Sequence, residues 1–298
     1  MTFVDFARMH GILIDFTPPL GKWQRYPTED KPHHRNGAVK YLGDCGWVQN
    51  HATMTEPETW FPDAEAKPVD RAKIQAAIDH QAKQRALDAA GAAKKAGWIL
   101  HQCRLEAHPY LASKGFDEME GNVWHTTDKA GAETALLVIP MFVDGHVVGI
   151  QMINEVGAKK FLLHQRTHEA TFTMGKGALP VLCEGFATGH SLRLCLQALK
   201  VPSRVIVCFS AGNLAKMAKH FTKAFVVGEH DMPSPLAPEP GGMGRKVAVE
   251  SGHPFYIPAK EGHDLNDQWK MHGTFATSQA LRLAMLGNHA HNMRKPEA

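Results

Sequence analysis

The sequence has few cysteines, and none of them are closely spaced in pairs. Five cysteines stand among 298 residues, and no two of them form a Cys-x-x-Cys pair. A tetrahedral zinc site normally requires paired cysteine or cysteine/histidine spacings, so no zinc is expected. Cys183, Cys195 and Cys208 fall within predicted strands or helices and are predicted to be small core residues. This use of cysteine favours a reducing, cytoplasmic compartment.

Other features that the sequence lacks exclude several classes of protein. The sequence has no secretory signal and no apolar run long enough to cross a bilayer, so we expect a cytoplasmic protein without a membrane partner. It has no Gly-x-x-x-x-Gly-Lys-Ser/Thr loop, which excludes a P-loop ATPase within these residues. The net charge is only +3 and the isoelectric point is near 8.5. This mildly basic balance permits nucleic-acid binding without indicating it.

Four apolar segments in the second half of the sequence predict strands. They begin near Leu179, Ser203, Lys223 and His253, and most of them run into turns of small or acidic residues. A helix with one apolar stripe is predicted after the first of them, over residues 187–200. Continuous apolar runs between turns are typical of an α/β fold in which helices flank a mainly parallel sheet.

Acidic residues follow three of these predicted strands. Since the carboxyl ends of parallel strands meet at one edge of a sheet, we expect Glu184, Glu229 and Asp231 to converge there with Asp264 and Asp267. A divalent cation would relieve the repulsion, and oxygen ligands favour Mg²⁺ or Mn²⁺. Taken alone, Glu184 could instead cap the helix that follows it, and Glu229 and Asp231 could be ordinary loop acids.

The order of these acidic turns resembles the Toprim domain, which bacterial-type primases share with topoisomerases of types IA and II and with some nucleases. The resemblance implies that Glu184 does general acid/base work and that Glu229 and Asp231 bind Mg²⁺, so that all three are catalytic residues. The sequence GHDLND matches a further acidic turn of primases. The implied metal set is therefore Glu184, Glu229, Asp231, Asp264 and Asp267.

Three segments upstream extend the resemblance to primases of phages and plasmids. They are EAHPYLASKGF from Glu106, LLVIPMFVDGHVVGIQMIN from Leu136 and GAKKFLL from Gly157. In such relatives a lysine-rich strand lies beside the acids. The resemblance thus implies that Lys159, Lys160 and Lys114 hold nucleotide or template phosphates, although a solvated charge pair is the alternative at 159 and 160. Strands are expected near residues 136–141, 147–153 and 160–163.

Two features depart from the Toprim pattern. Glu229 stands where the family usually has Asp, and the extra methylene would change the metal geometry and could reduce activity or shift it toward Mn²⁺. Residues 232–244, MPSPLAPEPGGMG, are longer and richer in proline than the expected short turn. They predict an extended surface loop that could serve as a flap over the site.

The N-terminal residues interleave cations with aromatic rings. Phosphates attract cations and unstacked bases stack on flat rings, so this composition is typical of single-stranded DNA binding. The candidate contacts are Lys22, Trp23, Arg25, Arg35, Lys40 and Trp47. The segment also resembles the zinc-ribbon region of phage primases without its metal ligands, since Tyr26 replaces an expected cysteine. The alternative is that Trp23, Trp47 and Trp60 fill a small core.

These patterns predict five consecutive parts. They are a degenerate zinc-ribbon-like β module (1–62), a linker and long helix interrupted at Gly91 or Gly97 (63–104), an α+β subdomain (105–178), a Toprim domain (179–272) and a C-terminal helix with a tail (273–298). The long helix reads as a solvated connector, with nucleic-acid binding as the alternative.

The implied function is that of a DNA primase, a nucleotidyltransferase that synthesises short primers on single-stranded DNA. Its substrates would be NTPs, its setting phage or plasmid replication in the cytoplasm of a host cell, and its partner a separate replicative helicase. Two alternatives stay open. The same acids could cut DNA, as in a Toprim nuclease, or the chain could be a non-catalytic adaptor for single-stranded DNA or a helicase.

Overall fold

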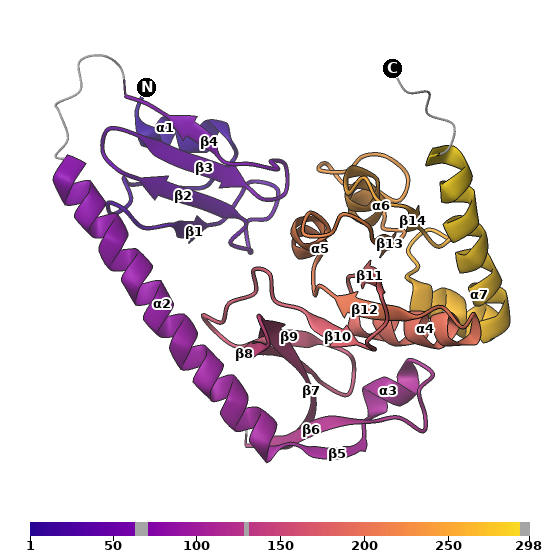
Figure 1. Ribbon diagram of the computed structural model, residues 1–298. Coiled ribbons are helices and arrows are strands. Elements are labelled where there is room, and N and C mark those ends of the chain that lie inside the picture. Colours follow the sequence, from indigo (N-terminus) through magenta and orange to yellow (C-terminus); the bar gives the residue numbers. More distant parts are fainter. Residues whose placement is uncertain (63–70, 128–130, 293–298) are drawn as a thin grey trace. The chain divides into compact units, whose positions relative to one another are not determined.

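The computed structural model describes residues 1–62, 71–127 and 131–292 (Figure 1). The chain folds into two compact units, Met1–Leu87 and Asp88–Ala298. Residues 63–70 of the predicted linker and residues 293–298 of the predicted tail lie outside the described residues. The second unit contains the predicted 105–178 and 179–272 segments together. None of the described helices is long and apolar enough to span a bilayer.

The N-terminal unit contains a small antiparallel β-sheet and one short helix. Helix α1 (Phe3–Met9) begins with a capping box in which Thr2 and Asp5 bond to each other's backbone N–H groups. Strands β1 (Gln24–Tyr26), β2 (Gly37–Tyr41), β3 (Gly46–Asn50) and β4 (Glu58–Trp60) pair in sequence order. Phe3, Val39, Val48 and Trp60 form the centre of its core. The expected small β module is present, and Trp60 is part of its core.

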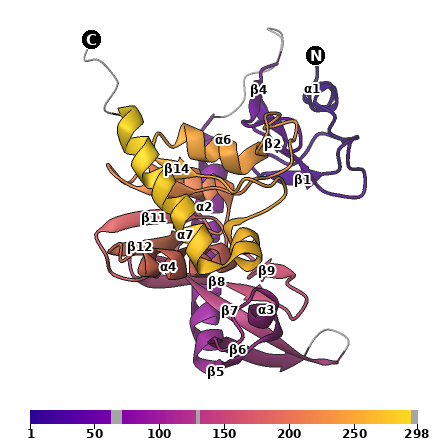
Figure 2. The same cartoon turned by 90° about the vertical axis from the view of Figure 1, so that its right-hand side faces the viewer.

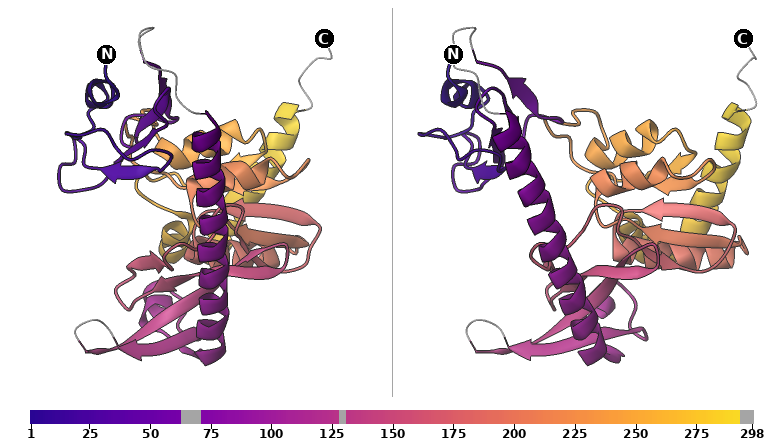
Figure 3. Two further views of the ribbon diagram at one scale, coloured as in Figure 1. Left: turned by 90° about the vertical axis from the view of Figure 1, so that its left-hand side faces the viewer. Right: turned by 60° about the vertical axis from the view of Figure 1, so that its left-hand side comes forward.

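Helix α2 (Arg71–Gln102) runs without interruption, as Figure 3 shows, so the predicted break at Gly91 or Gly97 is wrong. A helical glycine costs only about 1 kcal/mol relative to alanine, and the neighbouring Ala, Lys and Gln residues favour a helix. Its last turns are not a solvated connector either. Ala96 and Ile99 are fully buried and pack on Val138 and Ile150.

The first sheet of the C-terminal unit is antiparallel. It contains β5 (Arg104–Ala107), β6 (Glu120–Thr127), β7 (Glu133–Val143), β8 (His146–Ile153) and β9 (Lys159–Phe161), paired in that order. The short helix α3 (Pro109–Ser113) connects β5 to β6. The three expected strands are confirmed as β7, β8 and β9, whereas β5 and β6 had no clear signal in the sequence.

The second sheet is mainly parallel, as predicted. Its order is β10-β12-β11-β13-β14, and only β10 runs antiparallel to its neighbour. The strands are β10 (Phe172–Met174), β11 (Leu179–Cys183), β12 (Ser203–Val207), β13 (Phe225–Val227) and β14 (Phe255–Tyr256). In Figure 2 this sheet lies above the antiparallel one.

Four helices follow these strands in the C-terminal unit and cover both faces of the parallel sheet. They are α4 (Phe186–Ala198), α5 (Ala211–Ala218), α6 (Gly242–Glu250) and α7 (Leu265–Asn292). Side chains alternate between faces along each strand. Val181 and Cys183 therefore pack with α4 and α7, while Leu182 packs with α5 and α6. The helix predicted over residues 187–200 is confirmed as α4.

Two helix boundaries differ from expectation. The last three residues of the predicted loop at 232–244 form the start of α6. Helix α7 begins before the predicted C-terminal segment, but Gly273 inside it has φ 76° and ψ 174°, which divides it into two helical stretches.

All five cysteines are free, and the predicted core residues Cys183, Cys195 and Cys208 are buried.

Candidate active site at the carboxyl ends of β11 and β13

Strand pairing brings the two principal acidic turns together. Strands β11 and β13 are parallel neighbours in which Cys183 pairs with Val227. Glu184 follows Cys183 directly, and Glu229 lies two residues after Val227. Both carboxyl groups therefore lie at the same edge of the sheet, as the sequence predicted. Each side chain is partly buried.

The electrostatics of Glu229 reflect this crowding. Burial, reinforced by the charges of Glu184, Asp264 and Asp231, raises the pKa of Glu229 to about 8. Burial and the nearby Asp231 also raise the pKa of Glu184. Lys159 opposes both shifts. Burial and neighbouring carboxylates thus favour the protonated form of both glutamates, and a bound cation would favour their ionised form.

Each glutamate also lies near the start of a helix. The backbone N–H of Ala211, the first residue of α5, favours the ionised form of Glu184 and so opposes the rise in its pKa. A Cβ placed on Gly185, which precedes α4, would lie 3.6 Å from Oε1 of Glu229. Helix N-termini stabilise negative charge, so both helices support carboxylates at this edge. That distance is an ordinary van der Waals contact, so the Glu229 side chain lies directly against the N-cap of α4.

Asp231 is held by the first turn of α6. Its Oδ2 accepts a hydrogen bond of 2.7 Å from the N–H of Gly244. A Cβ on Gly244 would lie 2.2 Å from the carbonyl oxygen of Glu229, so only glycine permits this approach. The GGMG sequence that predicted a loop therefore brings α6 against the acidic turn.

Asp264 and Asp267 bond to each other's backbone at the start of α7. The N–H of Asp267 donates to Oδ1 of Asp264 over 2.9 Å, and the N–H of Asp264 donates to Oδ2 of Asp267 over 3.2 Å. This reciprocal pattern is a helix-capping arrangement. Asp264 nevertheless contributes to the raised pKa of Glu229. The structure thus brings Asp264 toward the other acids, while Asp267 supports the helix start.

The three lysines that were predicted to bind phosphates have different surroundings. Lys159, in edge strand β9, acts electrostatically on both Glu184 and Glu229. Lys160 is the next residue of the same strand, so its side chain lies on the opposite face. Lys114 contributes its backbone carbonyl, which accepts a 2.9 Å hydrogen bond from Nδ2 of Asn266. Of the three, Lys159 is the one that the structure brings to the acids.

Tyr110 is a residue of this site that sequence reasoning missed. Burial raises its pKa to about 12, and Asp264 and Glu229 add to the effect. Buried His108 orients the segment, since its Nδ1 accepts the N–H of Tyr110 over 3.2 Å. Both residues belong to the EAHPYLASKGF segment, which was singled out only for its family resemblance.

Carboxylates are the ligands that a hard cation prefers, but the carboxylates of this site do not surround a common point. Their oxygens are the donors that Mg²⁺ and Mn²⁺ prefer, and the pKa values of Glu184 and Glu229 are raised by burial first and by neighbouring carboxylates second. Over residues 1–62, 71–127 and 131–292, however, no three His, Cys, Asp or Glu side chains are arranged as a ready metal site. Binding of a cation would therefore require side-chain rotation, most of all at Asp231.

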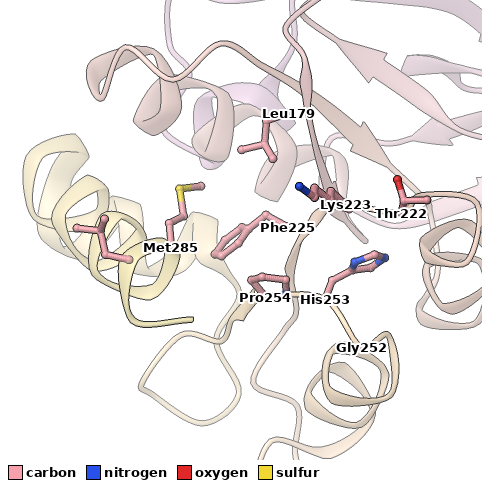
Figure 4. A pocket seen from close by; sticks show the side chains of 10 residues that line it. Leu179, Thr222, Lys223, Phe225, Gly252, His253, Pro254 and Met285 are labelled. Carbon is pink, nitrogen blue, oxygen red and sulfur yellow. The ribbon is translucent and has the colours of Figure 1, made fainter. Parts of the chain in front are cut away.

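A cavity of about 520 Å³ lies at the opposite edge of the parallel sheet (Figure 4). Leu179 and Phe225, which begin β11 and β13, line it together with Pro254 and Met285. Because these are the amino ends of the strands, the cavity is separate from the acidic turns. Its apolar walls provide no donor set for a cation.

In the N-terminal unit, strand register divides the predicted DNA contacts. Val39 pairs with Val48 in the core, so the neighbouring pair Lys40 and Trp47 lies on the other face. Arg25 pairs with Ala38 and shares that outer face. Lys40 Nζ lies 5.8 Å from the centre of the Trp47 ring. Lys22, Trp23 and Arg35 lie outside the strands, and Lys22 and Arg35 are exposed.

Comparison with known proteins adds little to this geometry. No family model matches the sequence, and no curated protein matches it. A structural match is a DNA primase domain from Pseudomonas aeruginosa, with 12% sequence identity and a TM-score of 0.33. The match covers 54% of this chain and 55% of that domain, so the chain spans about half of the matched protein. The α/β architecture therefore stands on the strand pairing described above.

Proposed function

We propose that the chain is a metal-dependent nucleotidyltransferase that synthesises primers on single-stranded DNA. The observation that carries the proposal is the position of Glu184 and Glu229 at the carboxyl ends of adjacent parallel strands, where burial and neighbouring carboxylates raise their pKa values. The order of these acidic turns along the chain resembles Toprim primases of phages and plasmids. The fold and the resemblance support the same site.

In this proposal Glu229 and Asp231 hold a divalent cation, with Asp264 and Asp267 completing the metal set. A bound Mg²⁺ or Mn²⁺ would supply Lewis-acid stabilisation of the nucleotide phosphates. Glu184 takes the proton from the attacking 3′-hydroxyl or shares the metal. Lys159 neutralises phosphate charge as it develops, with Lys160 and Lys114 holding phosphates farther along.

The outer face of the N-terminal sheet would hold the template. Arg25 and Lys40 neutralise phosphates, and Trp47 offers a ring on which bases can stack. Lys22, Trp23 and Arg35 extend this surface in the proposal. A separate replicative helicase would open the duplex, and NTPs would be the substrates.

Primer synthesis tests the proposal directly. The full chain is incubated with single-stranded DNA, labelled NTPs and either Mg²⁺ or Mn²⁺, and products are resolved by length. Product is expected with the wild type and should fall by about 10²-fold or more in Glu184→Gln and Asp231→Asn. Glu261→Gln changes an exposed glutamate and is the matched control. Undiminished synthesis in the first two variants would overturn the assignment.

A second candidate function is a non-catalytic adaptor that binds single-stranded DNA or a helicase. It is favoured by the hydrogen bond that occupies Asp231 and by the lack of a ready three-residue metal group among the described residues. DNA binding that survives EDTA, without synthesis under either metal, would support it. A nuclease is distinguished in the same assay, because hydrolysis of DNA needs the metal but no NTPs.

A further inference from the structure

A second pocket lies in the C-terminal unit, and none of the residues of the acidic turns lines it. It has a volume of about 670 Å³. One wall is a single face of α4, formed by His190, Arg193, Leu194 and Gln197 at helical spacing. The facing wall is the loop from Gly115 to Met119 together with Trp269 of α7. Both helices begin next to the acids, α4 after Glu184 and α7 after Asp264.

The aromatic wall of this pocket is fixed in place. The rings of Phe116 and Trp269 are stacked with centroids 5.3 Å apart and planes 26° apart. Trp269 Nε1 donates a 2.9 Å hydrogen bond to Oγ1 of Thr274. Gly115 has φ +84°, and a Cβ there would lie 2.8 Å from the Trp269 ring, so the backbone itself supports the indole. Phe116 is itself buried, so a ligand would meet the partly exposed Trp269 ring, whose fixed position lowers the entropy cost of binding.

The polar groups of the pocket are few and of mixed sign. Arg193 is exposed on α4, and Asp117 and Glu118 are exposed on the facing loop. His190 is neutral at physiological pH, because burial and the neighbouring Arg193 lower its pKa to about 4. A polyphosphate would be repelled by the two carboxylates. A flat, largely apolar ligand with amino donors on its edge would suit both the rings and the acids.

We propose that this pocket binds a nucleobase. The base lies against the aromatic wall, the Arg193 guanidinium contacts its second face or an adjoining phosphate, and Asp117 or Glu118 accepts from an exocyclic amino group. The pocket thereby prefers cytosine to thymine or uracil, which lack that donor. The base comes either from a free nucleotide or from single-stranded nucleic acid. The inference extends the proposed function but does not depend on metal chemistry at the acids.

Binding is measured with the full chain in EDTA at fixed salt, by anisotropy of labelled oligo-dC and oligo-dT and by calorimetry with CMP and UMP. Leu194→Glu introduces a carboxylate on the pocket wall at a side chain that is 38% exposed. Leu283→Glu, at a position on α7 that is 68% exposed, is the matched control. Loss of one stacked base is expected to weaken oligo-dC binding about fivefold or more in Leu194→Glu but not in the control. Arg193→Gln, an exposed and conservative change, should weaken it in the same direction.

Cross-linking locates the base independently of affinity. Single-stranded DNA carrying 5-iododeoxycytidine is irradiated with the wild type, and the cross-linked peptides are identified by mass spectrometry. Cross-links to the partly exposed Trp269 that CMP suppresses assign the site to free nucleotides, and cross-links that CMP leaves unchanged assign it to the nucleic-acid strand. Absence of cross-links there, with equal affinities of wild type and Leu194→Glu, would overturn the proposal. Because no metal is present, this result is separate from failure of primer synthesis.

Discussion

The carboxyl group of Glu229 combines burial with like-charged neighbours. Its pKa rises from the ordinary value of 4.5 to about 8 in the folded chain. The carboxyl group therefore stays protonated to a higher pH in the folded state than in the unfolded state. The contribution of this group to the free energy of unfolding is therefore fully present below pH 4.5. It decreases as the pH rises from 4.5 to about 8, and it stays constant above that pH.

Glu229→Gln is expected to remove this pH dependence. Glutamine keeps the shape of the protonated carboxyl without titrating, so the variant should exceed the wild type in unfolding free energy by about 1 to 3 kcal/mol above pH 8. The gain should shrink toward zero near pH 4.5. Urea unfolding in EDTA across this range measures it, with Glu261→Gln as the exposed control. A gain that does not change with pH would contradict the assignment.

Gly244 governs the contact between helix α6 and the acidic turn. A methyl group at this position would lie 2.2 Å from the Glu229 carbonyl oxygen, so α6 would have to move away. Gly244→Ala should lower the unfolding free energy by about 2 kcal/mol or more. It should also break the hydrogen bond from Gly244 to Asp231.

Gly212 provides the matched comparison, because a Cβ there has nothing within 4 Å. Gly212→Ala in α5 should leave stability equal or slightly higher, by at most about 1 kcal/mol. Thermal unfolding of the two variants side by side makes the test. Equal melting temperatures would show that the close approach of α6 is not required for stability.

Helix α2 carries two glycines that contact nothing within 4 Å, Gly91 and Gly97. Both are exposed within a continuous helix. Gly91→Ala and Gly97→Ala should each raise the unfolding free energy by about 0.5 to 1 kcal/mol, since alanine loses less conformational entropy in a helix. Circular dichroism melts measure the gain. A loss of stability would indicate that the helix bends at the substituted position.

The division into two units allows their contributions to DNA binding to be separated. Arg25 and Lys40 share the outer face of the N-terminal sheet, so the double variant Arg25→Gln/Lys40→Gln should weaken binding to single-stranded DNA. The slope of log affinity against log salt should fall by about 1.4, because two phosphate contacts are lost. Lys219→Gln/Lys260→Gln removes two exposed lysines of the other unit and serves as the control. An equal change of the salt slope in both double variants would contradict the assignment of the N-terminal face to DNA binding.

Several parts of the molecule could be predicted from the sequence because their signals are local. Apolar runs that end in small or acidic residues determine strands β11, β12 and β13, and the stripe of Leu192, Cys195 and Leu196 determines the face of α4 that packs on the sheet. These elements depend on side-chain periodicity, which needs no knowledge of distant contacts. The expected placement of Glu184 and Glu229 at one edge follows from the same reasoning.

Other features depend on contacts between distant segments. Strands β5 and β6 pair with neighbours along an antiparallel sheet, and their own sequences carry little periodicity. The approach of Tyr110 to the acids joins residues more than 100 positions apart. The division of Lys159 from Lys160 follows from strand alternation once β9 pairs with β8.

The sequence alone determined the order of the strands and helices around the acids, because apolar periodicity and turn residues act within a few positions. Tertiary structure decided which of the charged groups meet. It brought Lys159 close enough to Glu184 and Glu229 to oppose the rise in their pKa values. It also placed the Asp231 carboxylate on the N–H of Gly244 and the Asp267 carboxylate at the start of α7. The physical reason is that charge and burial act through space, over distances that only the folded backbone establishes.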